Sequence, residues 1–235
     1  MNIGVLLCDN VDAEVQKQYG TYNDFFKSFI SHSEPSARIK YYQVNQGEFP
    51  EKLTGHDAYM ISGSRRSCYE DEPWIKQLLV LIKKMSKAHV KIYGICFGHQ
   101  AIAEALGGKV EKNKAGWGLG VHDFDAEAGL IWAEPYKAKA SMVVSCQDQV
   151  VKLPHDAEVY LSTPFIKHGG YFIGKNIITT QAHPEMNHEY GKYLLSKRVK
   201  AQVISAEQAK EDTATFSKPL DNALISRWVH NFLKQ

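Results

Sequence analysis

Short apolar runs alternate with amphipathic stretches along the first half of the chain. Met1–Cys8 is an apolar run, Ala37–Val44 alternates between polar and apolar residues, and His56–Ser62 contains a third short apolar run, so these stretches predict three strands. Aromatic residues recur at helical spacing from Tyr19 to Phe29, and Trp74–Ala88 is amphipathic, so both stretches predict helices that pack against the sheet. Strands that alternate with helices predict an α/β fold with a mostly parallel central sheet and helices on both faces.

A further strand and helix meet at Cys96. The apolar run through Ile95 predicts the strand, and the helical pattern after Cys96 ends at the pair Gly107-Gly108. Gly94 and Gly98 allow a sharp bend that lifts the intervening side chain clear of the sheet. The helix N-terminus favours a thiolate and can bind a developing oxyanion. The alternative interpretation of this segment, taken alone, is that Cys96 is a small buried residue with a packing role.

A second motif ends another β-branched stretch, Asn176–Glu185, which predicts a further strand. It places His183 and Glu185 two residues apart, and Pro184 keeps the backbone between them extended. Residues two apart in an extended chain face the same way, so Glu185 can reach one imidazole nitrogen while the other faces a nucleophile. With Cys96, these residues predict a triad for acyl transfer.

Four segments together resemble class I glutamine amidotransferases, in the order that the family has. They are the nucleophile motif Gly94–Gln100, the His-Pro-Glu segment Ala182–Glu185, the oxyanion strand and turn Tyr59–Ser64, and the segment beside the glutamine site, Ser145–Pro154. The resemblance covers most of the chain, from Asn2 to Glu185. It is greatest to free-standing relatives of the GMP synthase amidotransferase domain. It implies a flavodoxin-like, mostly parallel sheet extended by antiparallel strands, in a single domain over residues 1–235.

The resemblance also implies roles for residues around the triad. Backbone N–H groups of Phe97 and Gly63 would hold the oxyanion, and Gln100 would contact the bound glutamine. The backbone around Ser145 and Cys146 would hold the amino-acid end of that glutamine. The sequence departs from the family pattern here, because Cys146 replaces an expected histidine.

Three functions are compatible with these motifs. The first is hydrolysis of the glutamine side-chain amide through a γ-glutamyl thioester, which releases glutamate and ammonia for an acceptor on a separate synthase subunit. The second is a γ-glutamyl peptidase or transferase, favoured by the altered Cys146 segment and the lack of an ATP-using synthase domain. The third is a non-catalytic regulatory module, against which the intact Cys96, His183 and Glu185 argue.

Composition narrows the classes of partner and cofactor. A chain of 235 residues with 44% hydrophobic and 23% charged residues suits one packed domain. A net charge of +2 without a basic cluster argues against nucleic acid, and no apolar run is long enough for a membrane span. We expect a cytoplasmic protein in which all 4 cysteines are free thiols. Cysteine spacing matches no metal site, and no cofactor is expected.

The second half of the chain has a different pattern. Short alternating runs and glycine-rich turns after Gly108 predict antiparallel strands, with a hairpin turn at Lys167–Tyr171. Charged amphipathic stretches predict helices at His188–Val203 and Asp221–Leu233. The polar stretch between them, Ser205–Ser217, is expected to be mobile.

Two polar features near the motifs have structural interpretations. The loop that carries Arg65 and Arg66 is expected to be solvated, and the alternative is that one of these arginines meets an acidic group of a substrate. His99 lies in the first helical turn after Cys96 and should point away from it, which favours a structural role.

Overall fold

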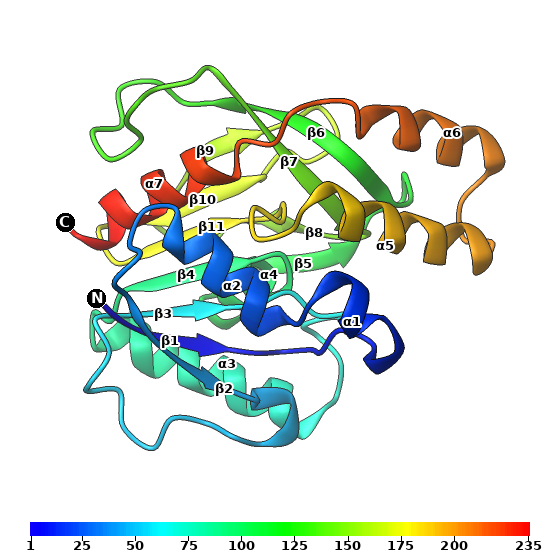
Figure 1. Cartoon of the computed structure of the whole chain (residues 1–235). Helices are drawn as coiled ribbons and strands as arrows, with labels where there is room; N and C mark the ends of the chain where they lie inside the picture. The colour runs from blue at the N-terminus through cyan, green and yellow to red at the C-terminus, as the bar shows by residue number, and fades with distance from the viewer.

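A nine-stranded sheet crosses the molecule in the order β2-β1-β3-β4-β11-β10-β9-β6-β7, and a two-stranded sheet, β5-β8, lies beside it (Figure 1). The computed structural model describes all residues, 1–235. The strands are β1 (Asn2–Leu6), β2 (Arg38–Tyr42), β3 (Ala58–Ile61), β4 (Ile92–Ile95), β5 (Lys109–Lys112), β6 (Gly118–Ala126), β7 (Lys139–Cys146), β8 (Asp148–Lys152), β9 (Ala157–Ser162), β10 (Gly170–Ile173) and β11 (Ile177–Thr180).

The sheet has a parallel half and an antiparallel half. Every neighbouring pair from β2 to β11 is parallel. Every pair from β11 to β7 is antiparallel. The predicted α/β fold with antiparallel extensions is confirmed. The predicted turn at Lys167–Tyr171 overlaps the end of the connection between β9 and β10 and the first two residues of β10.

Helices cover both faces of the sheet, because successive strand residues point to opposite sides. In β1, Ile3 and Val5 belong to one apolar core, which also contains residues of α2, α5 and α7. Leu6 belongs to the other core, with residues of α3 and α4. The helices are α1 (Gln16–Tyr19), α2 (Tyr22–Ser31), α3 (Pro73–Lys87), α4 (Phe97–Ala105), α5 (His188–Lys200), α6 (Ala206–Thr215) and α7 (Asn222–Leu233), with 3₁₀ turns at Ala13–Val15 and Val44–Gln46. None of these helices combines the length and the apolar character needed to cross a bilayer.

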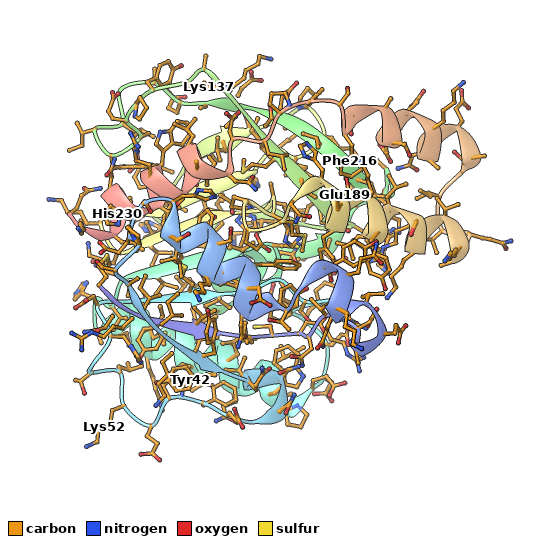
Figure 2. All side chains as sticks on the ribbon, viewed as in Figure 1. Tyr42, Lys52, Lys137, Glu189, Phe216 and His230 are labelled. Carbon is orange, nitrogen blue, oxygen red and sulfur yellow. The ribbon has the colours of Figure 1, made fainter.

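The prediction of a mobile stretch at Ser205–Ser217 is wrong, because this stretch forms helix α6. The Ser205 side chain accepts a hydrogen bond from the Gln208 N–H at 3.1 Å and caps the helix. No residue of α6 is buried, so the helix carries no apolar stripe that periodicity could detect. Phe216 ends the helix and packs against α5, where a Cβ at Gly191 would lie 2.7 Å from its ring (Figure 2).

His99 has the structural position that the sequence predicts. Its side chain is fully buried, and its Nδ1 atom lies 2.9 Å from the Thr179 hydroxyl. Burial, together with a smaller effect of His168, lowers the pKa of His99 to about 3. The ring is therefore neutral in the folded protein at every pH at which the chain is expected to work.

This burial predicts a pH-dependent stability. Between pH 6.5 and pH 3 the unfolded chain binds a proton at His99 that the folded chain does not, so stability falls as the pH falls through this window. From pH 7 to pH 5 the wild type should lose about 2 kcal/mol more free energy of unfolding than His99→Gln, measured by urea denaturation. His155→Gln, which alters an exposed histidine, should follow the wild type. If the free energy of unfolding fell equally with pH in the wild type and in His99→Gln, the assignment of this pH dependence to the lowered pKa of His99 would be contradicted.

Candidate active site

Cys96 lies on a tight turn between β4 and α4, as the flanking glycines predict. Its backbone has φ 50° and ψ −101°, in a region that residues with a side chain rarely adopt. The turn brings α4 close to neighbouring strands, because a Cβ at Gly98 would lie 2.4 Å from the Ile61 carbonyl oxygen. The Cys96 N–H donates to the Thr180 carbonyl at 2.8 Å, which ties the turn to β11. The Cys96 side chain consequently faces a cavity at the carboxyl ends of the parallel strands.

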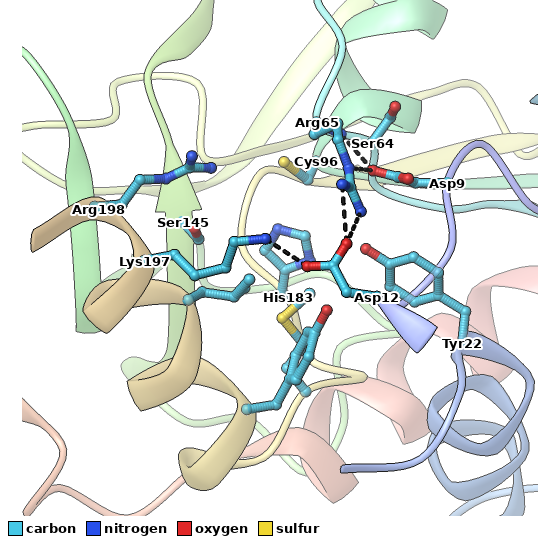
Figure 3. Close-up of a pocket in the computed structure, with 13 residues that line it drawn as sticks. Asp9, Asp12, Tyr22, Ser64, Arg65, Cys96, Ser145, His183, Lys197 and Arg198 are labelled. Carbon is cyan, nitrogen blue, oxygen red and sulfur yellow. Dashed lines mark hydrogen bonds and ion pairs between the residues drawn. The ribbon is translucent and has the colours of Figure 1, made fainter. Parts of the chain in front are cut away.

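His183 follows β11 and faces the same cavity (Figure 3). Its N–H donates to the Val143 carbonyl at 2.8 Å, so its backbone is held against β7. Its Nδ1 atom lies 2.7 Å from Glu185 Oε1, and the side chains of both residues are buried. This is the contact expected from two residues that flank a proline in an extended segment.

The charges around His183 favour its protonated form. Burial acts to lower the pKa of the imidazole, but the negative charges of Glu185 and Cys96 more than offset it, so that the pKa lies well above its usual value. Glu185 and Cys96 thus flank a protonated imidazole.

Gly63 brings the thiol and the imidazole together. A Cβ at this position would lie 2.8 Å from His183 Cε1 and 3.7 Å from Cys96 Cβ. Only a residue without a side chain allows so close an approach. The Gly63 N–H has no acceptor within the chain. Phe97 is the first residue of α4, so its N–H lies at a helix N-terminus, where backbone donors lack intrahelical partners.

The cavity has two lobes that meet at Cys96. The first, which we name the Gln100 lobe, has a volume of about 230 Å³. Its lining includes Gln100, Ser145 and Cys146, which the resemblance assigns to substrate binding. The amide nitrogen of Gln100 donates to the Asp148 carbonyl at 2.8 Å and to Gln181 Oε1 at 3.0 Å, which leaves its carbonyl oxygen for a ligand.

Sequence analysis missed Asp148 and Trp117 in the Gln100 lobe. The Asp148 carboxylate accepts hydrogen bonds from the hydroxyls of Ser67 and Tyr69. It follows Cys146 by two residues, and that spacing is a signal that could have identified it. Trp117 carries the Arg198 guanidinium over its ring at 4.0 Å from the centroid. No local pattern links two residues so distant in sequence.

The second lobe, which we name the Lys197 lobe, has a volume of about 100 Å³. Its charged lining residues are Asp9, Asp12, Arg65, His183, Lys197 and Arg198, and Figure 3 shows the ion pairs among them. The Arg65 side chain is 53% exposed, in keeping with a solvated loop, and it also donates to Asp9 at 2.8 Å and to Asp12 at 3.0 Å. Arg66 lies at the surface and pairs with Glu70 and Glu72, as that prediction has it. No group of three potential ligands in the chain could hold a metal ion.

Comparison with known proteins identifies the family. The model of the glutamine amidotransferase class-I family matches residues 22–201, most of the chain. The chain belongs to the class I glutamine amidotransferase family. The match includes Cys96 and the His183–Glu185 pair.

Proteins that are similar in sequence or in fold align over most of the chain. γ-Glutamyl peptidase 4 of Arabidopsis thaliana is 30% identical over 94% of this chain and 90% of its own. A glutamine amidotransferase of Thermotoga maritima has a similar fold, with a TM-score of 0.74, 18% identity and 99% coverage of both chains. A protein of Thermoplasma acidophilum described as part of a GMP synthase has a TM-score of 0.59 and 19% identity, covering 85% of this chain and 97% of its own.

Proposed function

We propose that this class I glutamine amidotransferase relative hydrolyses γ-glutamyl amides through a thioester on Cys96. The observation that carries the proposal is one cavity in which Cys96 lies beside His183, with His183 Nδ1 held 2.7 Å from Glu185. The nucleophile, the base and the group that orients the base are thus within one buried site.

The reaction has two half-reactions. The Cys96 thiolate attacks the γ-carbonyl carbon, and the N–H groups of Gly63 and Phe97 stabilise the oxyanion. As the C–N bond breaks, the His183 imidazolium gives its proton to the departing nitrogen, which leaves a γ-glutamyl thioester. Water that has given a proton to His183 then attacks the thioester, releases glutamate, and regenerates the Cys96 thiolate and the His183 imidazolium.

The glutamyl half of the substrate fits the Gln100 lobe. The Asp148 carboxylate, the Gln100 carbonyl oxygen and the backbone around Ser145 and Cys146 offer acceptors for an α-ammonium group. The Arg198 guanidinium borders the same lobe and forms an ion pair with no carboxylate of the chain, so it is free to attract the α-carboxylate.

The first test is release of glutamate by the purified chain. We expect turnover of γ-glutamyl-alanine, of a glutathione S-conjugate or of both, measured enzymatically as free glutamate, because a γ-glutamyl peptidase is similar along almost the full length. Absence of glutamate release from these compounds and from glutamine would refute the proposed function.

A second candidate is release of ammonia from glutamine for a separate acceptor protein. Membership of the glutamine amidotransferase family supports it. In that case glutamine should be the best substrate in the same assay, and a partner synthase, which the cell would supply, should raise the rate.

A further inference from the structure

The two lobes of the cavity lie on different sides of the reacting sulfur. The Gln100 lobe contains Gln100 and Asp148 and lacks His183. The Lys197 lobe contains His183 and lacks both Gln100 and Asp148. Because the leaving nitrogen must receive its proton from His183, the leaving group departs into the Lys197 lobe while the glutamyl group stays in the other.

The Lys197 lobe is larger than an ammonia molecule requires. Its volume is about 100 Å³, whereas a water-sized molecule needs about 10–15 Å³ on the same scale. Its lining includes Met186, Tyr190 and Leu194 as well as the charged groups. A lobe of this kind suits an organic amine with both an apolar and a polar part.

The charges of the Lys197 lobe favour a carboxylate. Asp9 and Asp12 both pair with Arg65, and Asp12 also accepts from Lys197 Nζ at 2.5 Å. Lys197 and then Arg65 lower the pKa of Asp12 to about 2, so Asp12 stays ionised and fixes the ammonium. The protonated His183 and Arg198, which also borders the Gln100 lobe, bring the cations of this lobe to four against these two carboxylates. The Lys197 ammonium keeps N–H donors that Asp12 does not use.

We propose that the Lys197 lobe binds the amine half of a γ-glutamyl peptide, and that Lys197 recognises the free carboxylate of that half. The proposal rests on the proposed function and names its substrate class: γ-glutamyl amino acids and short γ-glutamyl peptides with a free carboxyl end. Lys197 acts in specificity and not in bond breaking, because it borders the Lys197 lobe alone and does not reach the Gln100 lobe.

The test compares three substrates: γ-glutamyl-alanine, γ-glutamyl-alaninamide, which lacks the free carboxylate, and glutamine. Lys197→Met should lower kcat/KM for γ-glutamyl-alanine about tenfold or more, mainly through KM, because a charge-assisted contact is lost. It should change kcat/KM for the other two substrates by less than about twofold. Lys192→Met is the matched control, because Lys192 lies on the same helix and pairs with Glu189 at 2.8 Å outside the cavity. It should behave as the wild type does on all three.

The possible outcomes separate this proposal from the proposed function. A wild type that cleaves none of the three substrates overturns the role of Lys197, and it overturns the proposed function as well when the glutathione S-conjugate is also left uncleaved. Three outcomes overturn the role of Lys197 and leave the proposed hydrolase function standing. The first is a wild type that cleaves only glutamine. The others are a Lys197→Met variant whose kcat/KM falls equally on every cleaved substrate, or falls on no substrate. A Lys197→Met variant whose kcat/KM falls on γ-glutamyl-alanine alone supports the proposal.

Discussion

Cys96→Ala is expected to reduce turnover of γ-glutamyl substrates by about 10⁴-fold or more, since Cys96 is the only cysteine that lines the lobe containing His183. The fold should persist, because the change removes one sulfur atom from the edge of a cavity. Acid-quenched wild type should carry one γ-glutamyl group on the peptide that contains Cys96, detected by mass spectrometry, and the variant should carry none.

Cys68→Ala provides the control for the nucleophile. Cys68 is fully buried and lines neither lobe of the cavity, so this variant should keep its activity and its thioester. Equal loss of turnover in the two variants, or a thioester on another cysteine, would show that the nucleophile is assigned wrongly.

The second large effect is expected at His183. His183→Ala should lower kcat by about 10⁴-fold or more, because both the base and the acid are lost. Glu185→Gln should cost roughly ten- to a hundredfold less than His183→Ala, since the imidazole remains and only its orientation and charge stabilisation are weakened. Steady-state kcat on a γ-glutamyl dipeptide measures both.

Glu189→Gln is the control for the carboxylate. Glu189 lies on α5 with its side chain 69% exposed and paired with Lys192, so its loss should leave kcat unchanged. Equal impairment of Glu185→Gln and His183→Ala, with unchanged thermal unfolding, would argue that Glu185 acts directly in the chemistry.

Local sequence patterns predict the parts of the candidate site that are formed within one short segment of the chain. Gly94, Cys96 and Gly98 specify the bend before α4, and the extended segment around Pro184 specifies the His183–Glu185 contact. Most of the parallel half of the sheet was predictable because β1, β3 and β4 lie within short apolar runs.

Contacts between distant segments escaped sequence analysis. The Asp12–Lys197 pair joins residues 185 positions apart, and Arg65 meets Asp12 from another loop. Asp12, Arg65 and Lys197 are charged residues near the ends of elements, where charged side chains are usually solvated. Composition and spacing therefore do not predict that these three side chains contact one another. Helix α6 did leave a signal, because Ser205 and Gln208 have the spacing of an N-terminal cap, but its polar composition argued for disorder.

At Cys96, backbone stability and the proposed chemistry favour different residues, because a positive φ favours glycine and the chemistry needs a thiol. A non-glycine residue in such a conformation costs roughly 1–3 kcal/mol, a sizeable fraction of the stability of an ordinary domain. Glycine at position 96 would relieve that cost and remove the sulfur at the same time. If Cys96 is the nucleophile, as we propose, the chain keeps its thiol in exchange for a less stable fold, and the proposed nucleophile is also a position where a substitution would readily raise stability.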